Sequence, residues 1–549
     1  MKFLFGAILS LAFSIGAFAQ SPGVDYYRLG EKKLAKEVLT KEISQNPAQA
    51  YYYLGQLAFQ AGNMAEAKAN YEKGLAANAE SAINQIGIAK MDLKSNTKEA
   101  AKTLNNIAKK NKKDVVVLTE IAQAYLDNGM IKEALEKAEE VRKADKKSAL
   151  GYIIEGDIYA KENKAGDAAT QYEQAYTFDP SSTIAYVKYA KVYEGINSES
   201  SKSMLRKALE INPKFAIINK YLGDLNYSTG HYALAIDSYS KYFAAGDYSI
   251  DDLTRYAGAY FFTDNYTEAE RLISEGMKKE PNNFVLNRLL MYTQASTKDY
   301  DNALATADKF FNRQLAGDEK YIPRDYETYG EILLESGDVQ GALAQYAKLI
   351  ELDETKQSIY KDVATRLANE DKNAEAAAVY AKYIETAGEA VESLDFYQLG
   401  RYYYLAAQNL IKEEDEDMVA LRNSYIEAGD KAFTTVTERL PDNFLGYFWR
   451  ARIHTLADPN TTEGLAKPYY EDTARVITES GEVEENAGIL VEAYTYLAYY
   501  NYLQWVENTN AKKTTAANEA KANMKKYTEA LLEVDPTNAT GQQFMEVLK

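Results

Sequence analysis

The chain has 549 residues, a formal net charge of -18 at pH 7 and no cysteine. The lack of cysteine excludes disulfides, thiolate metal ligands and cysteine nucleophiles, and the negative charge argues against binding to nucleic acid or to an anionic lipid surface. Hydrophobic residues make up 46% of the chain, which excludes a wholly disordered protein, and a count of only 10 prolines favours helices.

The first predicted element is a secretory signal peptide over residues 1–19, MKFLFGAILSLAFSIGAFA. One basic residue, Lys2, precedes an apolar run, and an A-x-A cleavage site ends directly before Gln20. A membrane anchor is the alternative, but the run is short for a span of about 20 residues and no stop-transfer charges follow it. We therefore expect an exported, periplasmic protein, with an extracellular or outer-membrane-associated location as the alternative.

A repeating unit follows, and its clearest copy covers residues 149–180. Intervals of three and four residues place one set of small and aromatic side chains on one face of a first helix, and a second set on a second helix. Small residues let the two helices approach closely, and tyrosines fill the space beside them. The unit is a helical hairpin that must stack on further copies to bury its apolar face. The recurring residues are Tyr152, Gly156, Tyr159, Ala168, Tyr172, Ala175 and Pro180.

This pattern, with a period near 34 residues, resembles the tetratricopeptide repeat, whose signature is W-x2-L-G-x2-Y, then A-x3-F, then P. The resemblance implies an all-α fold, a right-handed superhelical α-solenoid of stacked helix-turn-helix hairpins. About a dozen such units are readable, and residues 25–47 form a partial unit that we expect to cap the array.

The spacing of the copies predicts two arrays. The first covers residues 20–312, a connecting loop covers 313–322, and a more divergent array covers 323–549. The loop is longer than a normal turn between repeats, which makes it the best candidate boundary.

No motif predicts catalysis. The two histidines, His231 and His454, belong to different repeats, and the chain has neither a phosphate-binding glycine loop nor a G-x-S-x-G elbow. The run Glu413–Asp417 has five carboxylates but lacks the glycine turn and alternating ligands of a calcium loop, so we interpret it as a solvated insertion. We therefore expect no enzyme activity, no cofactor and no metal site.

The chain holds 46 tyrosines, most of them at positions that pack between helices with the hydroxyl at the edge. In the tetratricopeptide family, further first-helix positions line a concave groove, and aromatic and arginine side chains there are typical interface anchors. The resemblance therefore implies a groove that binds a partner. Carried over to this chain, the groove positions are Tyr52, Tyr53, Gln56, Phe59, Lys220, Tyr221, Asp224, Tyr227, Arg255, Phe261, Phe262, Arg288, Tyr292, Tyr397, Arg401 and Tyr404.

The function that follows is a non-catalytic protein-protein interaction scaffold of the bacterial cell envelope. It would bind an extended or helical protein segment in its concave groove, and its partners would be cell-envelope components rather than nucleic acid. The family's carboxylate clamp is absent, because one of its positions holds Gln56, Asp157, Asp224 and Arg401 in four of the copies. A glycan- or peptidoglycan-binding module that uses exposed tyrosines is the alternative. Beyond the signal, no stretch predicts a transmembrane segment, and the oligomeric state stays open.

Overall fold

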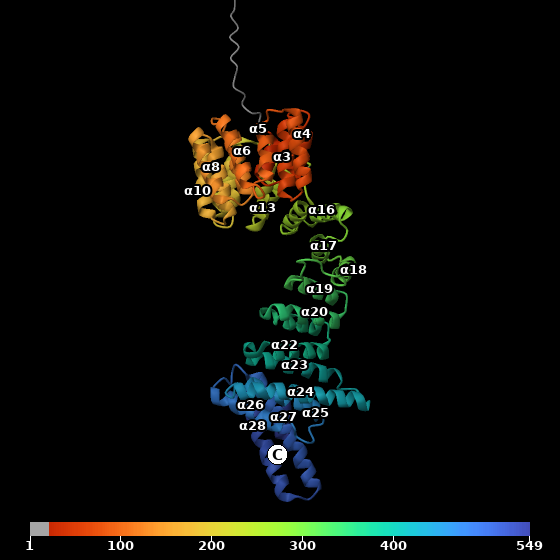
Figure 1. Ribbon diagram of the computed structural model, residues 1–549. Coiled ribbons are helices and arrows are strands. Elements are labelled where there is room, and N and C mark those ends of the chain that lie inside the picture. The colour runs from red at the N-terminus through yellow and green to blue at the C-terminus, as the bar shows by residue number, and fades with distance from the viewer. Residues whose placement is uncertain (1–20, 247) are drawn as a thin grey trace, which may run out of the picture. The chain divides into compact units, whose positions relative to one another are not determined.

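The computed structural model describes residues 21–246 and 248–549, and every regular element among them is a helix (Figure 1). The expected signal peptide at 1–19 lies outside these residues. The chain divides into two compact units, Met1–Glu319 and Lys320–Lys549, here called the first unit and the second unit. Their boundary falls within the predicted loop 313–322. The all-α fold of stacked hairpins is confirmed for the described residues.

The first unit consists of consecutive antiparallel hairpins, each formed by an odd-numbered helix and the next even-numbered one. Figure 1 shows α3, α4, α6, α8 and α10 standing side by side in this unit. The helices are α1 (Pro22–Arg28), α2 (Lys32–Glu42), α3 (Pro47–Gln60), α4 (Met64–Ala77), α5 (Ala82–Met91), α6 (Thr97–Lys110), α7 (Val115–Asp127), α8 (Ile131–Ala144), α9 (Ala149–Lys161), α10 (Ala165–Phe178), α11 (Thr183–Tyr193), α12 (Ser198–Ile211), α13 (Ile217–Ser228), α14 (Tyr232–Phe243), α15 (Ile250–Phe261), α16 (Tyr266–Lys279), α17 (Phe284–Ser296) and α18 (Tyr300–Phe311).

The second unit continues the hairpins with longer helices toward its end. Figure 1 shows α20, α22, α23 and α24 stacked on one another within this unit. Among residues 21–246 and 248–549, no helix has the length and hydrophobicity needed to cross a membrane. The helices are α19 (Pro323–Glu335), α20 (Val339–Leu352), η1 (Glu354–Lys356), α21 (Ile359–Asn369), α22 (Asn373–Ala387), η2 (Gly388–Ala390), α23 (Ser393–Asn409), α24 (Glu416–Arg439), α25 (Phe444–Ala457), α26 (Lys467–Ser480), α27 (Ala487–Asn510), α28 (Thr514–Val534) and α29 (Ala539–Leu548).

The turn inside most hairpins contains a residue with positive φ. Glycine supplies it at Gly62 (φ 79°) and Gly230 (φ 75°), where the absence of Cβ removes the steric penalty. Asn163 takes the same conformation at φ 58° in the clearest repeat. The next helix then starts on a polar cap, as where the Asn63 side chain accepts a hydrogen bond from the Glu66 backbone N–H at the start of α4.

In several hairpins an aromatic ring packs against a glycine of the facing helix. In α9 and α10, a Cβ placed on Gly156 would lie 2.5 Å from the Tyr172 ring, and Gly223 has the same relation to Tyr239 at 2.6 Å. Tyr172 and Tyr239 are both buried. The close approach expected between the small and aromatic positions is therefore present.

Gly156→Ala should lower the free energy of unfolding of the first unit by about 1–3 kcal/mol, because the new methyl group overlaps the Tyr172 ring. Gly166→Ala, in the same hairpin, is the matched control: a Cβ there has no atom within 4 Å. The control should be neutral or stabilising by less than about 1 kcal/mol. Urea unfolding followed by circular dichroism measures both, and equal stabilities for the two variants would contradict the packing described.

Candidate functional site

Helix α1 lies against helices that are far away along the chain. The Tyr221 Oη on α13 donates a hydrogen bond to Glu31 Oε1 over 2.5 Å, and the Lys191 Nζ on α11 donates one to the Leu29 carbonyl oxygen over 3.1 Å. Leu29 is buried among the side chains of α9, α11 and α13. The predicted capping unit at 25–47 therefore lies against the inner helices α11 and α13 of the first unit and covers part of their surface.

A buried carboxylate on α7 connects α1 to α3. Glu120 is 3% exposed and accepts hydrogen bonds from Tyr52 Oη at 2.8 Å and Tyr53 Oη at 2.7 Å. The Arg28 guanidinium lies 3.9 Å from the same carboxylate. Burial raises the pKa of both tyrosines well above the usual range, with the negative charge of Glu120 adding to the effect. The two tyrosines therefore act here as hydrogen-bond donors inside the unit.

A second set of buried polar side chains surrounds Lys90 on α5. The side chain is fully buried, its Nζ lies 2.7 Å from Asp127 Oδ2 and donates to Gln56, and it is 4.1 Å from the centre of the Phe59 ring. Tyr71 Oη also donates to Gln56, over 2.9 Å. Burial lowers the pKa of Lys90, while the charge of Asp127 opposes that shift.

Unlike Glu120 and Lys90, the Asp25 side chain on α1 has no hydrogen bond or close ion pair among the described residues. Burial raises its pKa to about 6, an effect that the charge of Arg28 opposes and that of Glu42 reinforces. Because the folded-state pKa lies above the unfolded value of 3.8, the folded unit favours the protonated form. The free energy of unfolding contributed by this group therefore falls as pH rises from about 4 to about 6 and stays constant above.

Asp25→Asn should remove this dependence. The difference in unfolding free energy between Asp25→Asn and the parent should be near zero at pH 4, grow in favour of the variant by about 1–3 kcal/mol by pH 6.5, and then level off. Chemical unfolding at a series of pH values measures it. A difference that does not change with pH would contradict the burial of this carboxylate.

The same arrangement of tyrosine, carboxylate and cation recurs along the inner helices. Asp157 Oδ1 on α9 accepts hydrogen bonds from Tyr172 Oη and from Lys188 Nζ of the next repeat, each over 2.7 Å. The charge of each carboxylate is thus neutralised inside the fold, and its lone pairs are used.

Two repeats later the pattern returns on α13. Asp224 accepts from Tyr239 Oη at 2.8 Å and from Lys220 Nζ at 2.9 Å, and the guanidinium of Arg255 on α15 lies 3.5 Å away. Lys220 and Arg255 also border a cavity of about 420 Å³ between α2 and helices α13 to α15, which Glu31 lines from the other side. The cavity is lined by both signs of charge.

In the second unit, the predicted groove residues of α23 come together around a tryptophan. The Arg401 guanidinium lies 5.6 Å from the Trp449 ring and 5.8 Å from the Tyr397 ring, and Tyr404 packs edge-on against Trp449 at 5.2 Å. Arg401 and all three rings are half-buried. A cluster of this kind offers a binding partner both apolar ring surface and a cation that can stack on aromatic rings.

This cluster continues onto α27 through Arg452. Its guanidinium lies 5.2 Å from Trp449 and forms two hydrogen bonds to Glu492, Nε to Oε1 at 2.9 Å and Nη2 to Oε2 at 2.6 Å. Glu492 borders a mostly aromatic cavity of about 480 Å³, and Tyr499 at its rim is 41% exposed. The cavity is lined by Tyr470, Glu492, Thr495, Tyr496, Tyr499, Thr540 and Phe544.

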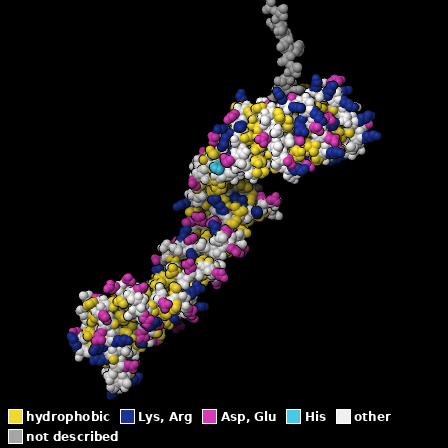
Figure 2. Space-filling view, turned by 90° about the vertical axis from the view of Figure 1, so that its left-hand side faces the viewer, with side chains coloured by type: hydrophobic (Ala, Val, Ile, Leu, Met, Phe, Trp, Pro, Cys, Tyr) yellow, Lys and Arg dark blue, Asp and Glu magenta, His cyan; other side chains and the backbone are white. Residues whose placement is uncertain are grey.

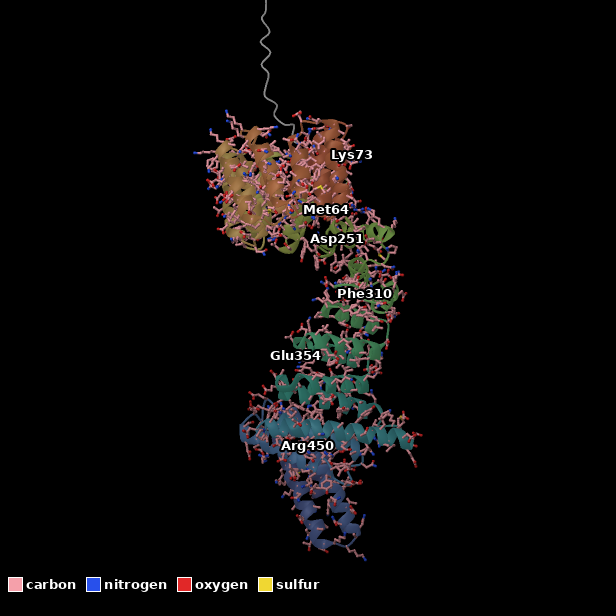
Figure 3. All side chains as sticks on the ribbon, in the orientation of Figure 1. Met64, Lys73, Asp251, Phe310, Glu354 and Arg450 are labelled. Atoms are coloured by element: carbon pink, nitrogen blue, oxygen red, sulfur yellow. The ribbon has the colours of Figure 1, made fainter. Side chains whose placement is uncertain are left out.

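The two histidines lie apart. His231 is an exposed residue at the N-cap of α14, as the sequence suggested. His454 on α25 is partly buried, with Nε2 3.2 Å from Asp430 Oδ1 and its ring stacked on Tyr469 at 4.8 Å. Arg450, labelled in Figure 3, also binds Asp430, with Nε to Oδ1 at 2.8 Å. In the described part of the chain, no group of three or more His, Asp or Glu side chains is arranged to hold a metal ion.

The sixteen predicted groove residues fall into three classes, and the picture of one exposed groove needs correction. Six are buried because neighbouring helices cover them, α1 and α2 among these in the first unit. The buried residues are Tyr52, Tyr53, Gln56, Tyr221, Phe261 and Tyr292. The half-buried ones are Phe59, Lys220, Asp224, Tyr227, Arg288, Tyr397, Arg401 and Tyr404, and the exposed ones are Arg255 and Phe262.

Sequence reasoning missed the part of this surface that lies on α25, α27 and α29. Trp449, Arg452, Tyr499 and Phe544 are not among the predicted groove residues. The helices α27 and α28 have 24 and 21 residues, so the 34-residue spacing no longer marks the inner face there. A helical-face analysis of α27 would have placed Glu492, Tyr496 and Tyr499 on one side.

Comparisons with known proteins agree with the repeat. Residues 23–82 and 119–183 match the family described as tetratricopeptide repeat. Comparison with curated proteins gives no match.

Among solved structures, the C-terminal part of a repeat protein of this type from Cytophaga hutchinsonii is 27% identical, covers 53% of this chain and 98% of its own, and has a TM-score of 0.28. One from Parabacteroides merdae is 12% identical over 52% of this chain and 98% of its own, with a TM-score of 0.27. PilW, a type IV pilus biogenesis factor, is 16% identical, covers 38% of this chain and 99% of its own, and has a TM-score of 0.32.

Stacked hairpins run through both units, and two stretches of the first unit match the family directly. The chain therefore contains tetratricopeptide repeats at residues 23–82 and 119–183.

Proposed function

We propose that this protein is an exported scaffold of the bacterial cell envelope, and that it binds a protein segment on the inner surface of its second unit. The binding surface, here called the aromatic face, consists of Arg401, Trp449, Arg452, Tyr499 and Phe544. Repeat proteins of this fold act as protein-binding scaffolds, and the fold itself assigns no catalytic role.

The observation that carries the proposal is the cavity of about 480 Å³ beside Tyr499 and Phe544. Aromatic rings line it, and its one carboxylate, Glu492, already accepts hydrogen bonds from Arg452 and from Tyr470 Oη at 2.9 Å. An apolar or aromatic side chain of a partner would therefore fill the cavity without leaving a charge unpaired. The neighbouring arginines would orient the rest of the segment by stacking and hydrogen bonding.

The first unit contributes less to such a surface. Its inner tyrosines are hydrogen-bonded and buried, as at Glu120, and its inner charges are paired, as at Asp157 and Asp224. Separating these groups to admit a partner would leave buried polar atoms without partners, at a cost of about 1–3 kcal/mol for each. We therefore assign the binding role to the second unit.

The export and envelope location rest on the signal-like sequence at 1–19 and on the absence of cysteine. N-terminal sequencing of the protein from a periplasmic extract tests both the cleavage of the signal and the location of the protein. A new N-terminus close to Gln20 supports export, whereas an intact Met1 in the cytoplasmic fraction contradicts it.

Binding is tested by crosslinking a tagged copy in cells, identifying the protein captured from the envelope fraction, and repeating the binding with purified components. The variant carries Arg401→Ala, Tyr499→Ala and Phe544→Ala, and we expect at least about tenfold weaker binding, since central aromatic and arginine anchors dominate interfaces.

The matched control carries Leu352→Ala and Leu394→Ala, which remove exposed leucines (55% and 59% exposed) from the same unit. It should bind as the parent does. A partner that binds both variants equally contradicts the assignment of the aromatic face as the binding surface. Purified protein that binds peptidoglycan fragments but no protein partner contradicts it as well.

A further inference from the structure

Unpaired positive charge gathers on the second helix of one hairpin in the first unit. Residues 94–113, which include α6, hold seven lysines and one carboxylate, Glu99, in a chain with a formal net charge of -18. Figure 2 shows dark blue lysine and arginine side chains on the surface of this unit. Most inner-surface charges described above are paired, so this local excess stands out.

The lysines of α6 form one row. Lys98, Lys102 and Lys109 follow one another at intervals of four and seven residues, which places them on one face of the helix, with Asn105 between them. All three are exposed, and the opposite face, with Leu104, is buried. We call Lys98, Lys102 and Lys109 the lysine stripe. It is about 16 Å long, at 1.5 Å per helical residue.

A cavity of about 430 Å³ opens beside the stripe, between α6, α7 and α8. Lys109, Lys137 and Lys143 line it, together with apolar atoms of Leu118. Lys137 is held in place, since its Nζ donates to Asn105 Oδ1 and to a glutamate of α8, each over 2.8 Å. The surface therefore combines a row of cations with a recess.

On the α8 side of this surface the lysines are paired, Lys137 with Glu140 and Lys143 with Glu139, each at 2.8 Å, whereas the stripe itself is neutralised only weakly. Lys102 pairs with Glu99 at 3.4 Å, and both side chains are more than half exposed. Lys98 and Lys109 form no ion pair within the described residues. Exposed pairs of this kind contribute about 0–1 kcal/mol, so a denser set of negative charges can displace them.

The chain itself carries such a set. The five consecutive carboxylates Glu413–Asp417, here called the acidic run, are exposed at the start of α24 in the second unit. None of them forms an ion pair with a lysine or arginine in the part of the chain that is described. Glu413 and Glu414 precede α24, Asp415 is its N-cap, and Glu416 and Asp417 form its first turn, so the run is shorter than the stripe and its charges face a part of it.

We propose that the lysine stripe is a homotypic contact surface, and that its occupant is the acidic run of a second copy of this chain. The contact uses an outer helix and is independent of the aromatic face. The net negative charge of each copy opposes association at long range, but at 0.15 M ionic strength this repulsion is screened beyond about 8 Å. The local match of charge then determines the contact.

The experiment uses the full-length chain and a fluorescent peptide with the sequence of residues 410–420, LIKEEDEDMVA. Fluorescence anisotropy should show binding that weakens as salt is added. The variant with Lys98→Glu, Lys102→Glu and Lys109→Glu should bind at least about tenfold more weakly, because three attractive pairs become repulsive.

The matched control makes the same change in charge elsewhere in the first unit, with Lys207→Glu, Lys214→Glu and Lys278→Glu at exposed lysines. It should bind the peptide within about twofold of the parent. Absence of peptide binding, or equal weakening in the two variants, overturns the proposal. Anionic phosphatidylglycerol vesicles that bind the stripe when the peptide does not would also overturn it, because the occupant would then be a lipid surface.

Sedimentation velocity on mixed chains gives the second test. The stripe variant alone should be monomeric, and so should a chain with Glu413→Lys, Glu414→Lys and Glu416→Lys. A mixture of the two should restore a pairwise complex, because the stripe and the run have exchanged charge. Failure of the mixture to associate, when the parent chain does, contradicts the proposed pairing.

Discussion

Glu120→Ala should lower the free energy of unfolding of the first unit by about 3–5 kcal/mol. The substitution leaves two buried tyrosine hydroxyls, on Tyr52 and Tyr53, without their acceptor, and removes the carboxylate that lies 3.9 Å from Arg28. Glu120→Gln should have an intermediate effect, because the amide oxygen still accepts one hydrogen bond.

The two tryptophans make this measurement selective. Trp449 and Trp505 both belong to the second unit, so their fluorescence follows the unfolding of that unit, whereas circular dichroism follows all helices. In Glu120→Ala, part of the dichroism change should move to lower urea while the tryptophan transition keeps its midpoint. Glu136→Ala, an exposed glutamate on α8, is the control and should change stability by less than about 0.5 kcal/mol. A Glu120→Ala chain as stable as this control would contradict the buried network.

The second large effect is expected at Leu29. This side chain is 5% exposed and lies among residues of α9, α11 and α13, so Leu29→Asp places an unpaired carboxylate inside the first unit. We expect a loss of about 3–5 kcal/mol, from the lost apolar burial and the desolvated charge together.

Leu234→Asp is the matched control, because Leu234 on α14 is 50% exposed and its carboxylate would remain in water. The same dichroism and fluorescence transitions measure both variants. If Leu29→Asp were as well tolerated as Leu234→Asp, α1 would not be part of the folded interior, and an open groove in the first unit would again be the better description.

The sequence predicted the hairpin well because its determinants are local. Gly156, Tyr172 and the turn at Asn163 lie within one repeat, and their spacing alone indicates which faces meet. The burial of tyrosines with their hydroxyls at the helix edge was also predicted, although the acceptors were not. Asp157 and Asp224 carry no periodic signal that marks them as partners.

The interior of the first unit could not be predicted in the same way. The contact between Glu31 and Tyr221 joins residues 190 positions apart, and the one between Leu29 and Lys191 joins residues 162 apart. Such contacts depend on how much each repeat rotates relative to the last, and small differences in packing accumulate over several repeats. The groove residues Tyr52 and Tyr53 were therefore assigned to the correct helix face, but that face is covered.

The central claim is that α1 forms part of the packed interior of the first unit, so that the aromatic face of the second unit remains for binding. Hydrogen exchange of the α1 amides, followed by mass spectrometry of a peptide covering residues 21–31, tests it most directly. We predict protection close to that of α3 and α7, lost only when the whole unit unfolds. Exchange of α1 as fast as that of an unstructured peptide, while α3 and α7 stay protected, would contradict the claim.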